Sequence, residues 1–147
     1  MSYRAAYDHS ETIAALASLA GASHVDIRPA PENPVHILQI HGTNDGTIAY
    51  EGADIAGNAY PSAKDTVAQW AEYNGCGAQA ADRELRDLVV NLEGHESSVM
   101  VFNQGCKAGG SCMNTRTRQA RGSSLAWRRW ARSWEYKSRS RICACTG

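Results

Sequence analysis

Several features are missing from this 147-residue chain, and each absence excludes a class of protein. No stretch approaches the roughly 20 consecutive apolar residues that a membrane-spanning helix needs. The first residues are polar and charged, and the apolar run behind them comes too late for a signal peptide, so we expect none. The five cysteines are an odd number, which excludes a fully paired disulfide framework.

Clustered metal ligands are also missing. Cys143 and Cys145 lie close together near the carboxyl end, but no second pair of ligands stands near them at the spacing of a zinc site. The sequence therefore gives no reason to expect a bound metal ion.

Acidic residues are scarce in the last part of the chain. Residues 112–147 contain nine Lys or Arg and one acid, for a net charge of +8, whereas residues 1–111 contain six Lys or Arg and fourteen acids, for a net charge of −8. Three of the four tryptophans, Trp127, Trp130 and Trp134, also fall in the basic part. We therefore expect two regions, 1–111 and 112–147, of different character.

The first region alternates extended and helical patterns. The spacing of apolar residues and the turn residues between them predict a helix end over 2–7, strands over 12–21 and 35–40, a helix over 62–74, and extended segments over 87–92 and 97–102. The strand over 12–21 is short, apolar and bounded by turn residues, which is typical of a strand buried on both faces.

The order of these elements predicts the fold class. Strands that alternate with helices are typical of an α/β protein with a parallel sheet, in which sites lie at the carboxyl ends of the strands. Asp45 stands at such an end, in the turn that follows the strand over 35–40. We therefore single out Asp45 as the first candidate functional residue.

Three motifs then occur in order: "HGTNDGTIAYEG" at 41–52, "YPSAKDTVAQWAEYNGCG" at 60–77 and "NQGCKAGG" at 103–110. Together they resemble the esterase/polyhydroxybutyrate depolymerase family of α/β-hydrolases, which has feruloyl and acetylxylan esterases as relatives. The resemblance covers roughly residues 1–111. It implies a serine carboxylic-ester hydrolase that needs no cofactor and acts on a small ester or polyester.

The resemblance implies that Asp45 is the acid of a Ser-Asp-His triad. A carboxylate on a rigid strand end can fix the tautomer of a histidine and stabilise the imidazolium that forms during acyl transfer. The alternative is structural, because an Asp side chain commonly stabilises its own turn. Both interpretations are open at this point.

The other two triad members are hard to find. No G-x-S-x-G nucleophile elbow occurs, and Ser2, Ser10 and Ser18 lack its flanking glycines. The segment from Met1 resembles the part of the family that follows the elbow, so we expect a carboxyl-terminal fragment that is inactive alone. The family's last strand and Gly-His turn should follow "NQGCKAGGS", but no histidine follows His95. His95 comes after Asp45 in the right order and is the candidate base, with a solvent-facing turn residue as the alternative.

Cys76 and Cys106 occupy positions where the family has cysteines. The resemblance therefore implies a disulfide between them if the protein is exported, as members of the family commonly are. Two reduced thiols are the alternative.

The basic region departs from the family after Ser111. It is either a disordered basic extension or the product of a shifted reading frame, and the expected last strand, histidine and helix are missing together. A functional alternative is a non-catalytic protein whose Arg- and Trp-rich segment binds an anionic membrane or nucleic acid. For the esterase interpretation we expect neither of those partners.

Overall fold

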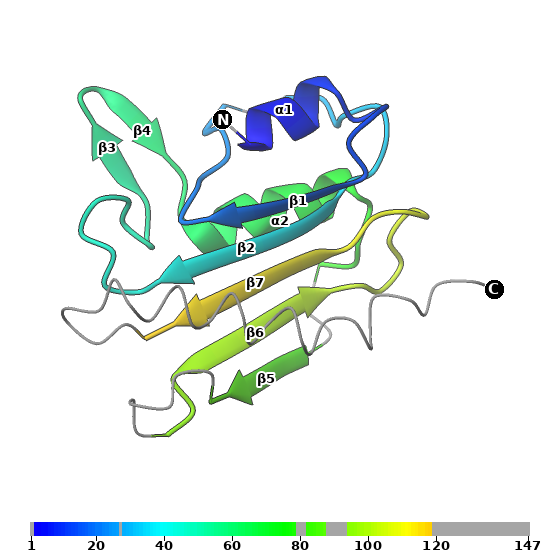
Figure 1. Ribbon diagram of the computed structural model, residues 1–147. Helices are drawn as coiled ribbons and strands as arrows, with labels where there is room; N and C mark the ends of the chain where they lie inside the picture. The colour runs from blue at the N-terminus through cyan, green and yellow to red at the C-terminus, as the bar shows by residue number, and fades with distance from the viewer. Residues whose placement is uncertain (1, 27, 79–81, 88–93, 119–147) are drawn as a thin grey trace.

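The computed structural model describes residues 2–26, 28–78, 82–87 and 94–118 (Figure 1). Predictions for residues 88–93 and for the Arg- and Trp-rich segment beyond 118 lie outside this part. The described elements, in chain order, are α1 (Ser2–Asp8), β1 (Ala15–Leu19), β2 (His36–Gly42), β3 (Ala53–Ile55), β4 (Asn58–Tyr60), α2 (Ala63–Tyr73), β5 (Asp82–Arg86), β6 (Ser97–Phe102) and β7 (Cys112–Thr117).

The fold is mixed α/β, built on a five-stranded sheet with the order β1-β2-β7-β6-β5. Strands β1, β2 and β7 are parallel, whereas β6 runs antiparallel to both β5 and β7. The prediction of a parallel sheet is therefore right for one half and wrong for the other. Only residues 103–111 connect β6 to β7. A parallel crossover needs a dozen or more residues, so the shorter connection returns the chain antiparallel.

The predicted boundary at Ser111 is not a boundary of the fold. Residues 112–117 form β7, which lies between β2 and β6 in the middle of the sheet. A strand is thus present just after Ser111, where the sequence analysis expects none. Sequence reasoning missed it because "CMNTRT" contains few apolar residues, and its strand conformation depends on neighbours on both sides.

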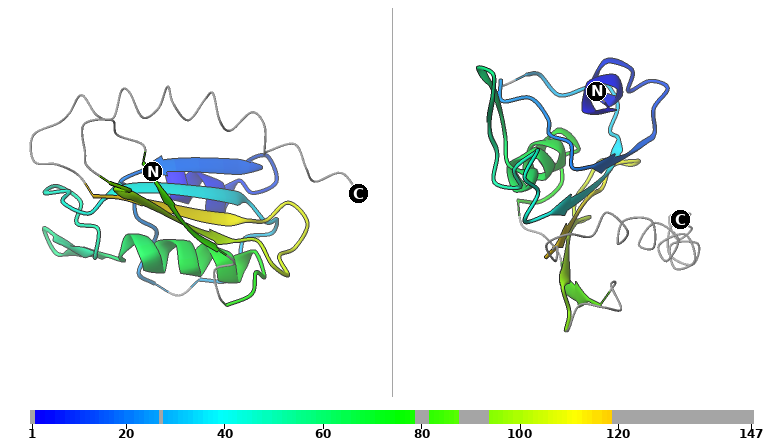
Figure 2. Two further views of the ribbon diagram at one scale, coloured as in Figure 1. Left: turned by 90° about the horizontal axis from the view of Figure 1, so that it is seen from below. Right: turned by 60° about the vertical axis from the view of Figure 1, so that its left-hand side comes forward.

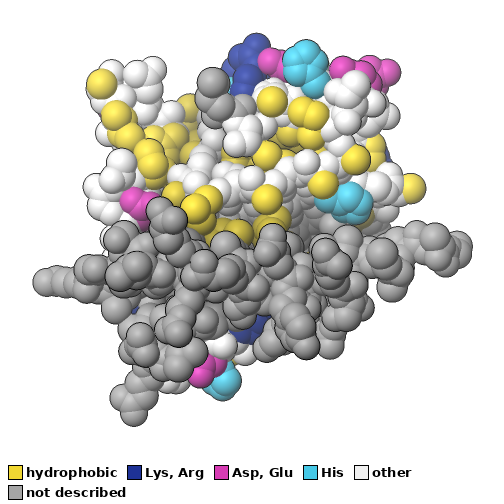
Figure 3. Space-filling model, in the orientation of Figure 1, with side chains coloured by type: hydrophobic (Ala, Val, Ile, Leu, Met, Phe, Trp, Pro, Cys, Tyr) yellow, Lys and Arg dark blue, Asp and Glu magenta, His cyan; other side chains and the backbone are white. Residues whose placement is uncertain are grey.

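Strand β1 lies within the predicted 12–21 segment, but the expectation that both of its faces are buried is wrong. Leu16 packs against the core, whereas Ala15, Ala17 and Leu19 are exposed, Leu19 by 59%. Figure 3 shows hydrophobic side chains on this face of the molecule. Strand β1 is at the end of the strand order, so among the described strands it pairs only with β2.

The helix predicted over 62–74 is α2, and its amino-terminal capping is as the sequence predicts. The Ser62 side chain accepts a hydrogen bond from the Asp65 backbone N–H at 3.0 Å. At the other end Gly75 has φ +67°, a left-handed conformation that favours glycine. Helix α2 lies on one side of the sheet (Figure 2), and its Trp70, 1% exposed, packs in the core.

The core lies between the two helices and the sheet. Helix α1 reaches it through Tyr3, whose ring centroid is 5.9 Å from that of Trp70. The buried members of this core cluster are Tyr3, Ala6, Val35, Ile37, Val67, Trp70, Ala71, Phe102 and Cys112. Both helices thus contribute to one core against the same sheet.

Asn74 connects α2 to two strands. Its buried side chain accepts a hydrogen bond from the Val35 N–H at 3.1 Å and donates to the Val35 carbonyl at 2.8 Å and to the Cys112 Sγ at 3.3 Å. Gly110 lies so close that a Cβ there would stand 3.0 Å from the Asn74 side chain. A larger residue at position 110 would therefore have to displace the Asn74 side chain by a few tenths of an ångström, so glycine fits best where the chain passes Asn74 to enter β7.

Two further features were not predicted from the sequence. Strands β3 and β4 form a hairpin between Asp45 and Pro61, where the sequence analysis predicts no helix or strand. Strand β5 covers 82–86, just before the extended segment that was predicted over 87–92. No described helix is long and apolar enough to cross a membrane.

A disulfide joins Cys76 and Cys106, the pair that the family resemblance implies. It links the end of α2 to the connection between β6 and β7 across 30 positions of sequence. Closing a loop of this length stabilises the fold by about 3.5 kcal/mol on the chain-entropy model.

Replacing both cysteines by alanine should lower the free energy of unfolding in urea by that amount, and adding reductant to the unaltered protein should give the same loss. A loss below about 1 kcal/mol in both experiments would contradict this.

Stability should also depend on the Cys112 thiol at alkaline pH. Burial raises the pKa of Cys112 from an ordinary value near 9 to about 12. The fold favours the neutral thiol, so this contribution is complete below pH 9 and is lost as the pH rises from 9 to 12. Urea unfolding over this range should show a shallower decline for Cys112→Ala than for the unaltered protein. Tyr3→Phe should likewise show a shallower decline than the unaltered protein, since burial also raises the pKa of Tyr3. Equal slopes with and without the thiol would exclude this contribution.

Candidate functional site

Three segments meet at the edge of the sheet where β2 and β7 end. The Thr43 N–H donates to the Thr117 carbonyl at 3.0 Å, and the Arg118 N–H donates to the Glu96 carbonyl at 2.9 Å. Because β6 is antiparallel, its first residues lie at the same edge as the last residues of β2 and β7. The turn with Asp45, the end of β7 and the start of β6 are therefore neighbours.

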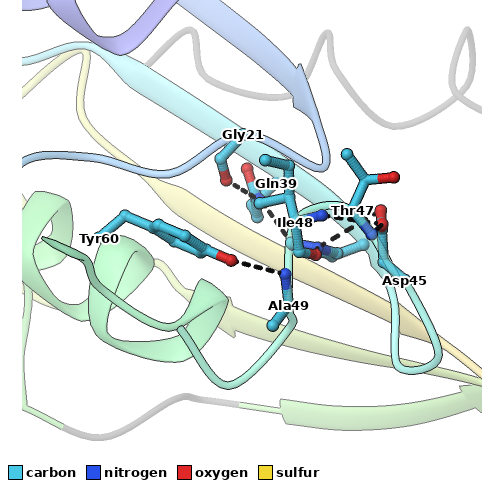
Figure 4. A network of polar contacts seen from close by, with 8 residues as sticks. Gly21, Gln39, Asp45, Thr47, Ile48, Ala49 and Tyr60 are labelled. Atoms are coloured by element: carbon cyan, nitrogen blue, oxygen red, sulfur yellow. Dashed lines mark hydrogen bonds and ion pairs between the residues drawn. The ribbon is translucent and has the colours of Figure 1, made fainter. Parts of the chain in front are cut away.

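Asp45 lies in the turn that follows β2, at the strand end where the sequence places it. Its Oδ1 accepts hydrogen bonds from the backbone N–H groups of Thr47 at 2.9 Å and Ile48 at 3.0 Å (Figure 4). Its Oδ2 is 3.9 Å from the Nε2 of His41, which is longer than a hydrogen bond. The turn thus fixes one carboxylate oxygen and leaves the side chain 22% exposed.

His41 lies beneath this turn and is 1% exposed. Its Nε2 is 2.9 Å from the Ile48 carbonyl oxygen, and its Nδ1 is 3.2 Å from the Nε2 of Gln39. The Tyr50 ring packs edge-on against the imidazole, with centroids 5.5 Å apart. Both ring nitrogens of His41 are therefore engaged, so this histidine has a structural rather than a proton-transfer environment.

Gln39 continues the network toward helix α1. Its amide nitrogen donates to the Gly21 carbonyl at 2.7 Å, and its Oε1 accepts from the Tyr3 hydroxyl at 2.6 Å. Gln39 is fully buried. Sequence reasoning overlooked it, although a polar residue inside the apolar run "VHILQI" is the signal that could have identified it.

A second tyrosine supports the far end of the turn that contains Asp45, which we call the acid turn. The Tyr60 hydroxyl accepts a hydrogen bond from the Ala49 N–H at 2.9 Å (Figure 4). Because Tyr60 is the last residue of β4, the β3–β4 hairpin and the acid turn are connected. No specific signal in the sequence indicates this contact.

The candidate base His95 lies at the same edge of the sheet as Asp45. It precedes β6 and its side chain is exposed, as the turn alternative expects. Among the described residues, the Asp45 carboxylate contacts Thr47, Ile48 and His41, and His95 is not one of its partners. The described structure therefore brings His95 to the right edge but does not join it to Asp45.

Of the three serines considered in the sequence analysis, Ser10 and Ser18 have structural surroundings, whereas Ser2 is exposed at the start of α1. Ser10 is buried, and its Oγ accepts a hydrogen bond from the Asn33 N–H at 3.1 Å. Ser18 is buried within β1, on the side of the strand that faces the core. Among the described residues, no group of three or more His, Cys, Asp and Glu side chains could hold a metal ion.

No protein-family model and no curated protein matches this chain. The family resemblance therefore depends on the sequence motifs at 41–52, 60–77 and 103–110 alone.

The two hydrogen bonds to Asp45 Oδ1 lead to a prediction about the stability of the turn. Asp45→Ala removes the acceptor and should lower the free energy of unfolding by about 1–2 kcal/mol. Asp45→Asn keeps a side-chain oxygen at the same position and should stay within about 0.5 kcal/mol of the unaltered protein. Urea unfolding of both variants measures the difference, and an equal loss in the two would show that the charge, not the acceptor, stabilises the turn.

Proposed function

We propose that residues 1–118 are the carboxyl-terminal part of the catalytic domain of an α/β-hydrolase serine esterase, and that Asp45 is its triad acid. The substrate would be a carboxylic ester of the polyhydroxyalkanoate or feruloyl type. In the intact enzyme a serine would attack the ester carbonyl, form an acyl-enzyme and release it by hydrolysis.

The geometry of Asp45 is the observation that carries this proposal. A triad acid has to hold one orientation while an oxygen stays available to a histidine N–H. Two backbone N–H groups fix Oδ1 of Asp45, whereas Oδ2 lies 3.9 Å from its neighbour among the described residues, His41 Nε2, which is beyond hydrogen-bond distance. A carboxylate that only stabilised its turn would need no more than the first half of this arrangement.

The topology supports the same proposal. Helices α1 and α2 pack into one core on the same side of the sheet, and α2 lies on the path from β2 to its parallel neighbour β7. Such crossovers are right-handed, so a strand that led into α1 would lie outside β1. Its carboxyl end would then be two strand spacings, about 10 Å, from that of β2. A histidine can bridge a nucleophile at that place and Asp45.

The end of β7 is where the proposal places the histidine. Thr117 pairs with Gly42, three residues before Asp45, so a loop that leaves β7 begins beside the acid turn. In this chain the next residues are Arg118, Gln119, Ala120 and Arg121, none of which can act as a general base near neutral pH. His95 is the alternative base, since it lies just before the start of β6, which is at this same edge of the sheet.

We predict that the 147-residue chain does not hydrolyse esters by itself, because no G-x-S-x-G elbow is present in its sequence. The rate of p-nitrophenyl butyrate cleavage should equal that of buffer with an inert protein, and Asp45→Asn should leave it unchanged. Turnover that requires Asp45 in this chain would contradict the proposal.

The coding DNA provides the complementary test. The proposal expects an in-frame G-x-S-x-G shortly upstream of Met1 and, because β7 ends at Thr117, a Gly-His turn in another frame after Arg118. A protein extended to contain both should cleave the ester, and Asp45→Asn should lower its kcat by about 10⁴-fold, as loss of the acid does in a serine protease triad. An extended protein whose activity is insensitive to this substitution would exclude Asp45 as the triad acid.

A further inference from the structure

We propose that His41 and Gln39 are positioning residues for the acid turn. They form a buried relay from Tyr3 of α1 to Ile48, and this relay sets the direction in which the Asp45 carboxylate points. The inference rests on the proposed function for its catalytic meaning, but the relay itself is a property of the described residues.

The two backbone carbonyls, of Gly21 and Ile48, determine which atom carries each hydrogen in the relay. The Ile48 carbonyl can only accept, so the Nε2 of His41 carries the hydrogen, and its Nδ1 is left as an acceptor. The amide nitrogen of Gln39 then donates to Nδ1, as it also donates to the Gly21 carbonyl. Its Oε1 is thereby turned to the Tyr3 hydroxyl. With His41 in this one neutral tautomer, each of the four hydrogen bonds of the relay pairs a donor with an acceptor.

Ile48 is the link between the relay and the carboxylate. Its carbonyl accepts from His41 at 2.9 Å, while its own N–H donates to the Oδ1 of Asp45 at 3.0 Å. A shift of this peptide segment would therefore move the group that holds the carboxylate. The relay acts on Asp45 through the backbone and does not require direct contact between the imidazole and the carboxylate.

The other end of the relay is in α1. The Tyr3 hydroxyl is buried, and burial raises its pKa, so that it stays a hydrogen-bond donor over the whole physiological range. In the proposed enzyme, α1 is the helix that follows the nucleophile elbow. The relay therefore connects the helix of the nucleophile to the turn of the acid, two elements whose separation the triad has to keep constant.

A hydrogen on the Nδ1 of His41 would find no acceptor among the described residues that surround it. A hydrogen on Nδ1 would face the amide hydrogens of Gln39, which is held in its orientation by Gly21 and Tyr3. The groups around the imidazole are Gln39, the Ile48 carbonyl, the Tyr50 ring and, at 3.9 Å, the Asp45 carboxylate. These contacts therefore direct the Nε2 hydrogen of His41 to the Ile48 carbonyl.

Two substitutions of His41 separate positioning from simple packing. A glutamine side chain is long enough to place an amide N–H where the Nε2 of histidine stands, so His41→Gln can still donate to the Ile48 carbonyl. An asparagine side chain reaches only as far as Nδ1, so His41→Asn loses this hydrogen bond. Both variants remove the ring and its contact with Tyr50, which makes them a matched pair.

Amide hydrogen exchange and the ¹³Cγ resonance of Asp45 measure the result by NMR. In His41→Asn we expect the Thr47 and Ile48 amides to exchange at least about tenfold faster relative to the amides of β6, with a changed Asp45 resonance. In His41→Gln both readouts should stay near those of the unaltered protein. Equal effects in the two variants, or no effect of His41→Asn on either readout, would overturn the proposal.

The unaltered protein gives a test that does not depend on folding of the variants. Long-range ¹H–¹⁵N spectra near neutral pH should show His41 in the tautomer with hydrogen on Nε2, and that hydrogen should exchange slowly. Hydrogen on Nδ1, or fast exchange, would overturn the relay. None of these readouts uses ester hydrolysis, so an inactive extended protein would count against the proposed function alone.

Discussion

The pairing of β7 on both sides is the constraint on which the sheet depends. Without Cys112–Thr117, β1 and β2 would form one pair of strands and β5 and β6 another, and two-stranded units are marginal in water. Strand β7 also brings Cys112 under Asn74 and Thr117 beside Gly42. The core under α2 and the edge that carries the acid turn therefore both rely on the same six residues.

Buried polar side chains, more than apolar ones, determine how the chain is arranged around this sheet. Asn74 is bonded to the backbone before β2 and to the thiol of β7, and Gln39 is bonded to a loop, a helix and a histidine. Such groups are costly to bury unless each donor finds an acceptor. Because these partners come from distant parts of the sequence, satisfying them selects one arrangement among the many that would bury a similar apolar area.

Local signals were enough to predict some elements from the sequence and not others. Helix α2 could be predicted because Ser62, Asp65 and Gly75 encode its ends, and β2 because its apolar run is bounded by turn residues. The burial of β1 was misjudged, since the same short apolar pattern occurs in central and edge strands. Strand β7 was missed because Arg116 and Thr117 take an extended conformation only between β2 and β6. The position of Asp45 followed from the motif, whereas the hydrogen bonds that hold it depend on Ile48, His41 and Gln39 in three dimensions.

The outer backbone edge of β1, which pairs with no described strand, affects the behaviour of the protein in solution. Natural edge strands commonly carry lysine, proline or a bulge that prevents other chains from adding a strand. The sequence of β1, "ALASL", contains no charge and no proline, and no described strand lies beyond it. Its outer backbone groups and Leu19 form a template for strand addition, which favours self-association as the protein concentration rises.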